Sequence, residues 1–185
     1  NRKYCVEFMW NSLYRRFCLL TVLSALSVMA FAQSGDENFD RAEQLYKEQN
    51  FKKAVVFYKK SADDGNVSAQ YALANCYYYG QGVDRNVNTA VEMWLKCAEK
   101  GHSDAQNRVG ACYYEGEAVE KNYDEAARWW KLAAEQGNMS ALYDLGICYY
   151  NGHGVERDFE KAMELWRKSA AQGNADAIGM LKMFE

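Results

Sequence analysis

The residue types that most often carry catalysis or bind metals are few and scattered in this chain. Only two histidines occur in its 185 residues, His102 and His153, and each stands alone in a glycine-containing connection. We therefore expect both to be exposed loop residues. From residue 33 onward there is no S-x-x-K, H-E-x-x-H or G-x-S-x-G arrangement, so the commoner hydrolase sites lack their parts. The expectation is a protein that is not an enzyme, with neither catalytic residues nor a cofactor.

Cysteines supply the other possible chemistry, and three of the four beyond residue 32 share one spacing. Cys76, Cys112 and Cys148 lie 36 residues apart. Equivalent positions of successive helical layers should be about 10 Å apart, beyond the Cα separation of about 7 Å that a disulfide tolerates. Cys97 falls near the end of a second helix, at the opposite end of its layer from Cys76. The spacing predicts four free thiols packed as small apolar side chains, with neither disulfides nor a metal site.

The spacing of the cysteines runs through most of the chain. Glycine, alanine and tryptophan recur in the same register, at Gly65, Gly101, Gly137 and Gly173, at Ala69, Ala105, Ala141 and Ala177, and at Trp94, Trp130 and Trp166. A period of about 20 to 50 residues indicates stacked supersecondary units rather than one closed core. Solenoids of this kind present an extended surface instead of a catalytic pocket.

Residues 101–136 show what one unit is. We expect a first helix that begins at the capping residue Asp104 and ends at Gly116. The capping position holds Ser68, Asp104, Ser140 and Asp176 in the four copies. A second helix begins at Asn122, again a capping type, and places Trp130 against small alanines. The unit is thus a helical hairpin, and the fold class is an all-α solenoid of such hairpins.

This unit divides the chain into six segments. They are a signal peptide at 1–32, a shorter first hairpin at 36–64, three full repeats at 65–100, 101–136 and 137–172, and a capping helix at 173–185. The atypical units at the two ends fit the caps that a solenoid needs.

Residues 1–32 have the pattern of a signal peptide. Arg15 and Arg16 precede an uncharged apolar run that ends in a small-x-small cleavage site at Ala32, and Met9 is the expected start. A retained membrane anchor is the alternative, but the run of about 15 residues is shorter than the ~20 that cross a bilayer. We expect an exported protein, periplasmic or extracellular, with no other membrane segment.

The charge balance limits the partners. Residues 33–185 carry 18 Lys and Arg against 24 Asp and Glu, a net charge of −6. Nucleic acids and anionic membranes need a clustered basic face, so neither is expected as a partner. Proline is absent and aromatic residues reach 15%, which indicates an ordered helical chain without a low-complexity linker.

The last full repeat resembles the Sel-1-like repeat family, which is related to the tetratricopeptide repeats. The matching positions are Ala141, Leu145, Gly146, Tyr149, Gly152, Gly154, Val155, Asp158, Lys161, Ala162, Trp166, Ala170 and Gly173. Other copies depart modestly, with Ala74 for a helix glycine and Ala118 for a loop glycine. The resemblance implies a right-handed superhelix and an adaptor that holds a peptide or protein on its concave face.

By analogy with tetratricopeptide grooves, the resemblance places the binding face on first-helix residues that point away from the core. These are Tyr71, Asn75, Tyr78 and Tyr79, then Asn107, Ala111, Tyr114 and Glu115, then Tyr143, Ile147, Tyr150 and Asn151. Amide groups can bond the backbone of an extended peptide while tyrosine rings supply contact area. The alternative is that Tyr78, Tyr114 and Tyr150 only pack between layers.

An exported scaffold for a peptide or protein is therefore the expected function. One alternative is a small-ligand binder or enzyme acting on cell-wall or β-lactam-like molecules, because the family includes a cysteine-rich group that binds penicillin-like compounds. That group pairs its cysteines at short spacing, a pattern that this chain does not follow. A second alternative is a chaperone for envelope proteins. A compact pocket with converging charges would favour the small ligand, and an open groove would favour the scaffold or the chaperone.

Overall fold

The computed structural model describes residues 37–184, and every regular element within that range is a helix. A helix over residues 37–47 is followed by α2 (Phe51–Asp63), α3 (Val67–Tyr79), α4 (Val87–Glu99), α5 (Ser103–Glu115), α6 (Tyr123–Glu135), α7 (Met139–Asn151), α8 (Phe159–Ala171) and α9 (Ala175–Lys182). The expectation of an all-α chain of helical hairpins is confirmed. The expected signal peptide lies outside the described residues.

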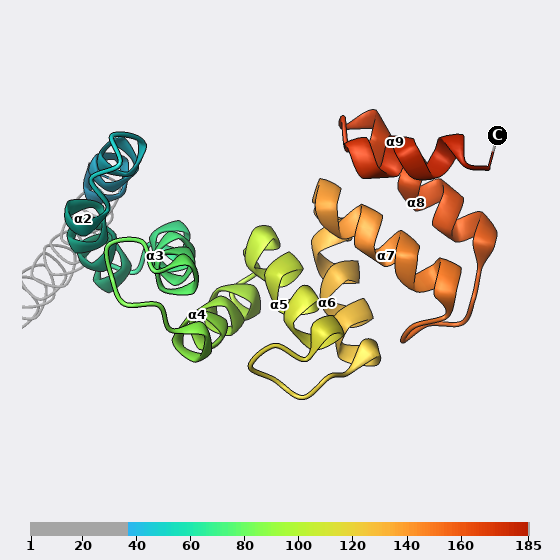
Figure 1. Ribbon diagram of the computed structural model, residues 1–185, viewed down its shortest axis with the longest axis horizontal. Helices are drawn as coiled ribbons and strands as arrows, with labels where there is room; N and C mark the ends of the chain where they lie inside the picture. Colours follow the sequence, from blue (N-terminus) through green and yellow to red (C-terminus); the bar gives the residue numbers. More distant parts are fainter. Residues whose placement is uncertain (1–36, 185) are drawn as a thin grey trace, which may run out of the picture.

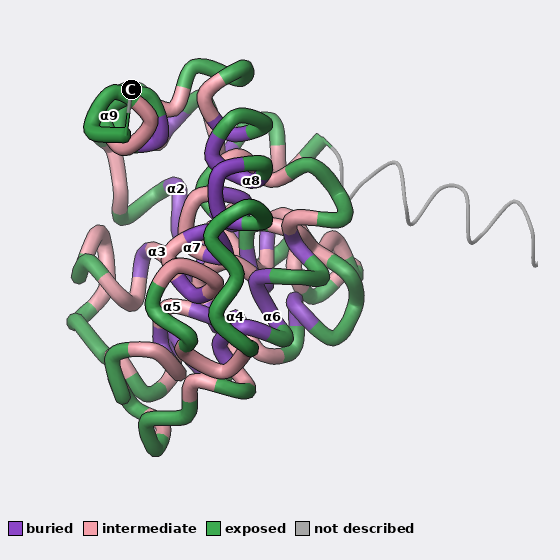
Figure 2. The backbone as a smooth tube through the Cα atoms, turned by 90° about the vertical axis from the view of Figure 1, so that its right-hand side faces the viewer, coloured by how far each residue is buried: buried purple, intermediate pink, exposed green. Residues whose placement is uncertain are grey.

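The helices stack in the order of the sequence. Each helix from α2 to α9 packs mainly against the helices before and after it in the chain. In Figure 1 the stack forms an arc, and in Figure 2 the helices α3, α5, α7 and α9 lie toward one side and α4, α6 and α8 toward the other. We call the first of these the inner side and the second the outer side. Buried residues follow the lines where helices face each other, while the loops and α9 are largely exposed (Figure 2). The hairpins are therefore held together by a succession of buried clusters along the stack, and they present two open sides.

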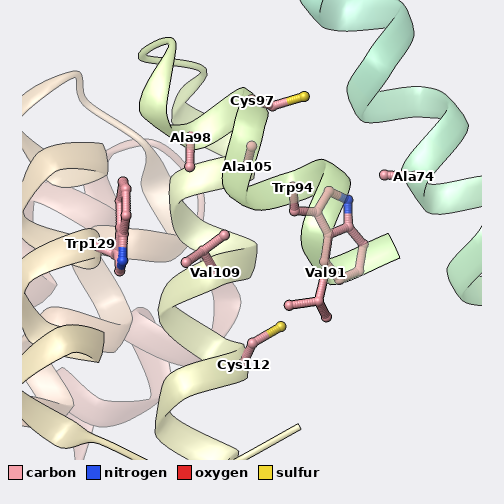
Figure 3. Packing of buried hydrophobic residues seen from close by; sticks show 9 residues of the cluster. All are labelled: Ala74, Val91, Trp94, Cys97, Ala98, Ala105, Val109, Cys112 and Trp129. Atoms are coloured by element: carbon pink, nitrogen blue, oxygen red, sulfur yellow. The ribbon is translucent and has the colours of Figure 1, made fainter. Parts of the chain in front are cut away.

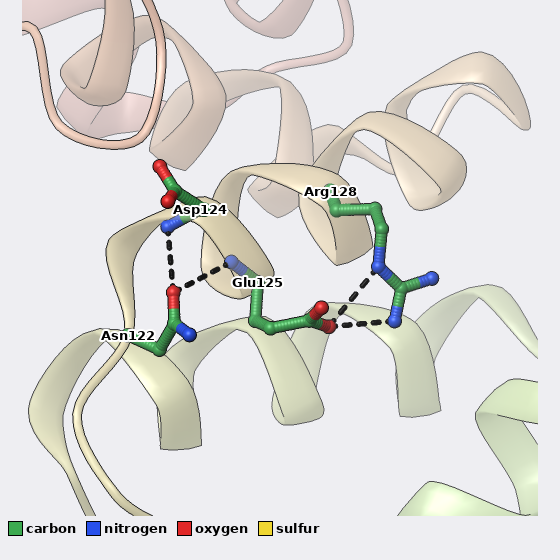
Figure 4. Close-up of polar contacts among 4 residues, drawn as sticks. All are labelled: Asn122, Asp124, Glu125 and Arg128. Atoms are coloured by element: carbon green, nitrogen blue, oxygen red, sulfur yellow. Dashed lines mark hydrogen bonds and ion pairs between the residues drawn. The ribbon is translucent and has the colours of Figure 1, made fainter.

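The second helix of each repeat begins at the expected capping residue. The side chain of Asn86 accepts a hydrogen bond from the Thr89 amide, and that of Asp158 accepts one from the Lys161 amide. Asn122 accepts two, from Asp124 and Glu125 at 3.0 and 3.1 Å (Figure 4). These bonds satisfy amides that have no partner inside the helix, so the start of each second helix is determined locally.

The first helices begin two residues earlier than expected. Their caps are Asn66, His102, Asn138 and Asn174, which accept from the amides of Ala69, Ala105, Ala141 and Ala177. The expectation that Ser68, Asp104, Ser140 and Asp176 cap these helices is wrong. The reason is the joint glycine, because the left-handed backbone of Gly101 (φ +90°) turns the chain so that the next residue is already extended. Asp104 instead lies in the first turn, where a carboxylate favours the helix dipole, and it accepts a hydrogen bond from Asn138.

The loops between the two helices of a repeat depend on left-handed residues. The expected helix-ending glycines Gly80, Gly116 and Gly152 adopt φ of 70°, 78° and 76°. Two further loop glycines, Gly82 and Gly154, touch the preceding second helix, and a Cβ on Gly82 would lie 2.4 Å from the carbonyl oxygen of Phe51. The repeat at 101–136 has Ala118 at this position, with φ of 59°. This conformation costs a residue with Cβ about 1–2 kcal/mol. That loop keeps the backbone shape although its methyl group needs more room.

A tryptophan from each second helix anchors its repeat. Trp94, Trp130 and Trp166 are almost completely buried. Trp130 and Trp166 lie directly over glycines of the preceding first helix, and a Cβ on Gly110 would be 2.7 Å from the ring of Trp130. The indole N–H groups of both rings donate to backbone oxygens of that helix at 3.1 Å. The ring therefore needs a helix surface without a side chain beneath it.

In the repeat at 65–100, the tryptophan packs on the preceding helix in a different way. Ala74 of α3 occupies the place of the glycine, and Trp94 extends from α4 toward α3 (Figure 3). Its indole N–H donates to the side-chain oxygen of Asn75 at 3.1 Å. The equivalent positions in the next two repeats are Ala111 and Ile147, which offer no acceptor. Ala74 and Asn75 thus act as a pair, the amide replacing the backbone acceptor used elsewhere.

The cysteines belong to this core. Cys76, Cys97, Cys112 and Cys148 are buried free thiols. Burial raises the pKa of Cys76 to about 11 and that of Cys148 to about 12, so both remain protonated at neutral pH. They pack as small apolar side chains with low reactivity.

Gly110→Ala should destabilise the chain by about 1–3 kcal/mol, because the added methyl group displaces Trp130. Adding Ala111→Asn should restore part of that loss, since the pair then copies Ala74 and Asn75. Urea unfolding followed by tryptophan fluorescence measures both. Gly179→Ala is the matched control, because a Cβ there meets nothing within 4 Å and should raise stability slightly through helix propensity. Equal stability of Gly110→Ala and the native chain would contradict the role of the glycine.

The cap of α5 is the only one of the four first-helix caps in the described chain that can titrate. His102 accepts the Ala105 amide through Nδ1 at 3.3 Å, and its ring stacks on Tyr71 at 4.7 Å. Burial lowers the pKa of His102, with Asp104 opposing the shift. Protonation places a hydrogen on the accepting nitrogen, so the charged ring cannot cap the helix.

We expect the native chain to lose stability as the pH falls below about 6.5, because a folded-state pKa lowered from that value penalises protonation. The variant His102→Asn, which has the cap of the other repeats, should lose about 1 kcal/mol less between pH 7.5 and pH 5. Urea unfolding at the two pH values gives the difference, and groups common to both chains cancel. Identical pH dependence of the two chains would show that the histidine cap does not respond to pH.

Candidate partner-binding face

The tyrosines expected on the inner face are partly committed to the core. Tyr78, Tyr114 and Tyr150 lie over Trp94, Trp130 and Trp166, with ring centroids 5.0, 5.3 and 5.7 Å apart. The interplanar angles, 43°, 46° and 45°, are nearly the same in the three repeats. For these three rings the structure supports the packing alternative, since each covers the anchor tryptophan of its own repeat.

The hydroxyl groups of this set link one repeat to the next. Tyr78 donates to Glu117 at 2.9 Å, and a hydrogen bond of 2.9 Å joins Tyr114 to Nδ1 of His153. Glu117 and His153 occupy the same position of successive loops, and Gln81, one loop earlier, accepts from Tyr46 at 2.5 Å. Each joint is therefore closed by a tyrosine and a loop side chain of differing chemistry.

Both histidines lie in connections between helices, as expected, but the expectation that they are exposed is wrong. His153 is half-buried and stacks on Tyr123 with centroids 4.4 Å apart and planes 8° from parallel. His102 is also half-buried, as the cap of α5 stacked on Tyr71. The contacts that bury them come from residues about 30 positions away in the sequence, so local composition does not reveal them.

Basic residues cover the outer edge of the tyrosine set. Arg85, Lys121 and Arg157, again 36 residues apart, lie 5.7, 6.0 and 5.8 Å from the ring centroids of Tyr78, Tyr114 and Tyr150. Cation–π contacts at such partly exposed sites contribute about 0.5–1 kcal/mol each. The three rings are thus held from the tryptophan side and from the loop side.

One row of the expected site is exposed. Tyr79, Glu115 and Asn151 occupy the last turns of α3, α5 and α7, and 52% of the Tyr79 surface is accessible. The other expected residues, Tyr71, Asn75, Asn107, Ala111, Tyr143 and Ile147, are half-buried. Of these, Asn75 is already bonded to Trp94, and the amide oxygen of Asn107 is buried without a partner among the described residues. The exposed row is the part of this face that is available for contact.

Sequence reasoning missed two charged residues of the same helices. Arg108 of α5 lies with its guanidinium 5.8 Å from the Trp94 ring centroid and donates to the Tyr79 hydroxyl at 3.3 Å. Asp144 occupies the same register position one repeat later. Burial, and to a lesser extent the nearby carboxylate of Asp176, raise the pKa of Asp144 to about 7.

A signal for these residues does exist in the sequence. The register position that holds Arg108 and Asp144 holds Ala72 in the preceding repeat. A position that changes from apolar to basic to acidic on one helix face does not serve the common packing, and so it is a candidate for contact with a partner. The face therefore combines aromatic and amide side chains with a cation in one repeat and a carboxyl group of raised pKa in the next.

These features define a class of protein: an α-solenoid of stacked helical hairpins, with polar and aromatic side chains that differ from repeat to repeat on its inner helices. The chain belongs to the Sel1 repeat family, whose family model matches residues 43–66, 67–102, 103–138 and 140–174. Proteins with Sel1 repeats generally serve as protein-interaction scaffolds, and the fold is typically not catalytic.

Solved structures with the same architecture come from several bacteria. The structure of c5321, a protective antigen of uropathogenic Escherichia coli with an SLR fold, is 30% identical, with a TM-score of 0.75 over 84% of this chain and 34% of that one. A Sel1 repeat protein from Oxalobacter formigenes is 29% identical, with a TM-score of 0.73 over 79% of this chain and 60% of its own. The chain thus spans about a third and three fifths of these two proteins.

A curated relative comes from Helicobacter pylori (strain ATCC 700392 / 26695). HcpD, whose name gives it a provisional assignment as a beta-lactamase, is 32% identical over 71 residues, which are 38% of this chain and 23% of HcpD. The matched part is too small a share of HcpD to bring the activity in its name to this chain. Within residues 37–184, no helix is long and apolar enough to cross a bilayer.

Asp144→Asn should remove a pH-dependent loss of stability. Because the folded-state pKa is raised from about 3.9 to about 7, the native chain loses stability as the pH rises from about 4 to about 7. The free energy of unfolding of the variant, relative to that of the native chain, should be higher at pH 8 than at pH 5 by an amount on the order of 1–3 kcal/mol. Urea unfolding at both pH values measures it. Asp176→Asn should give a smaller effect in the same direction. If the stability difference between each variant and the native chain is the same at both pH values, the carboxyl group of Asp144 is in contact with water.

Proposed function

We propose that the protein is an exported scaffold that binds an extended peptide or protein segment along the inner side of α3, α5 and α7. The observation that carries the proposal is the exposed row of Tyr79, Glu115 and Asn151, one residue per repeat, beside half-buried side chains that are already held in place. A row with this spacing suits a partner that runs across the repeats.

The charged residues of the face indicate the chemistry of that partner. Arg108 is fixed between the tyrosines of α3, where it can pair with a carboxylate of the segment. One repeat away, burial and the nearby carboxylate of Asp176 raise the cost of ionising Asp144. A lysine or arginine of the segment would remove that cost. We therefore infer a partner with an acidic residue and a basic residue separated by about one layer, roughly 10 Å.

Tyr78, Tyr114 and Tyr150 have a supporting part in this function. Because they cover the anchor tryptophans, with Tyr78 and Tyr114 also bonded to the following loop, they keep the spacing between layers constant. A rigid set of layers lowers the entropy lost when a segment is bound. Export to the periplasm or the cell exterior is proposed from the pattern of residues 1–32 alone.

Selection of a random peptide library on the purified chain tests the proposal. Selected peptides should bind about tenfold more weakly to the triple variant Tyr79→Ala, Glu115→Ala, Asn151→Ala. They should also lose affinity for Arg108→Ala if they contain an acidic residue. Fluorescence anisotropy measures each affinity, and circular dichroism confirms that the variants remain helical.

Val56→Ala together with Arg167→Ala is the matched control, since both residues are exposed on helices of the outer side. Its affinity for the selected peptides should equal that of the native chain. Peptides that bind all the variants equally would contradict the inner face as the binding site. A library that yields no binder, combined with retention of a fluorescent penicillin, would favour the small-ligand alternative.

A further inference from the structure

The outer side of the solenoid carries a second position that differs from repeat to repeat. Met93, Trp129 and Leu165 occupy one register position of α4, α6 and α8. Trp129 is only 6% exposed and lies in one buried cluster with Val109 of its own hairpin and Ala98 of the preceding one, so its ring fills the space between α4 and α6. Methionine and leucine are smaller and fill the equivalent spaces less completely.

The two smaller residues each line a cavity between successive second helices. The cavity beside Met93 has a volume of about 430 Å³ and lies between α2 and α4. The cavity beside Leu165 has a volume of about 230 Å³ and lies between α6 and α8, with Leu142 and Leu145 of α7 also lining it. Both lie on the opposite side of the first helices from the exposed row of the inner face. We call the second of them the α6–α8 groove.

The rim of the α6–α8 groove is basic. Lys131, Lys161 and Lys168 line it together with a single acidic residue, Glu135. Lys168 is paired with Glu164 at 2.6 Å. The Lys161 ammonium lies 4.5 Å from the ring centroid of Tyr149, which also lines the groove, and neither Lys131 nor Lys161 has an ion-pair partner among the described residues. The rest of the chain is acidic, with a net charge of −6 over residues 33–185. This basic rim around an apolar floor is therefore complementary to an apolar group flanked by carboxylates.

The size of the groove limits its occupant. Pockets that enclose a drug-sized molecule have volumes of about 300–1,000 Å³, and the α6–α8 groove, at about 230 Å³, is smaller. It has room for one or two aliphatic side chains. Helices that dock in shallow grooves insert anchors of this size at positions i and i+3 or i+4. The occupant that fits both volume and charge is an acidic amphipathic segment of another protein.

We propose that the α6–α8 groove is a second interaction surface, which binds an acidic amphipathic segment through aliphatic anchors over Leu142, Leu145 and Leu165 and through Lys131 and Lys161 at the rim. This surface is independent of the inner face, so the proposal does not rest on the function proposed above. The protein would then hold two partners on opposite sides of the same hairpins.

The test uses a fluorescein-labelled helical peptide about twelve residues long, made of glutamate and alanine with leucines at positions i and i+4. The same peptide with lysine in place of glutamate is the charge control. Titration of the purified chain, read by anisotropy, should show binding of the acidic peptide only. Amide chemical shifts of the labelled protein should change in α6, α7 and α8 around the groove.

Leu165→Trp should close the groove, because the chain already accommodates Trp129 at the equivalent position. We expect this substitution to lower the affinity for the acidic peptide by about tenfold. Met93→Trp is the matched control, since it fills the other cavity and should leave the affinity unchanged. Lys131→Glu with Lys161→Glu, at two exposed positions, provides a second variant that should reduce binding and its salt dependence, and circular dichroism checks that it remains helical.

The outcomes separate the possible occupants. Loss of binding with Leu165→Trp and with the charge reversal, but not with Met93→Trp, supports the proposal. Equal binding of the basic peptide, or shift changes confined to the inner face, overturns it. Binding of a fatty acid without binding of the acidic peptide identifies a lipid as the occupant and also overturns it. Self-association of the native chain that Leu165→Trp abolishes would identify a second copy instead.

Discussion

The contact between each second-helix tryptophan and the first helix beneath it is the constraint on which the rest of the solenoid depends. Burying a ring of this size supplies a large share of the apolar area in a unit that is too small to have a core of its own. The contact requires glycine beneath Trp130 and Trp166, and a compensating amide beside Trp94. Tyrosine and arginine or lysine then complete the coverage of each ring, so a repeat is a fixed set of partners and not only a pair of helices.

The period, the fold class and the ends of most helices could be predicted from the sequence because their causes are local. A capping side chain acts within three residues, and a left-handed glycine acts at its own position. The first-helix caps were misplaced by two residues because two acceptable capping types follow each other closely, as with Asn138 and Ser140. Only the backbone of the preceding glycine decides between them.

The positions that make up the inner face could be predicted from the sequence. Which of them pack against the core and which are accessible to a partner could not. Tyr78 and Tyr79 are identical in type and adjacent in sequence, yet one covers a tryptophan and the other is half accessible to solvent. The partners that decide this, such as Glu117, lie in the next repeat. For the same reason the sequence offered no sign that His153 would stack on Tyr123. Within a repeat protein, the positions that change between copies are more informative about contact with partners than those that recur.

The loop at Ala118 has a consequence for the curvature of the whole molecule. Its equivalents Gly82 and Gly154 touch the backbone at the start of the preceding second helix, closer than any side chain allows. Ala118 keeps the left-handed conformation of these glycines, and its methyl group needs additional room beside the corresponding residue of α4, Val87. Successive layers are joined in series, so a small change of angle at this one joint displaces everything beyond it in proportion to distance. The room that one methyl group needs at residue 118 therefore bears on the relative orientation of the two ends of the superhelix.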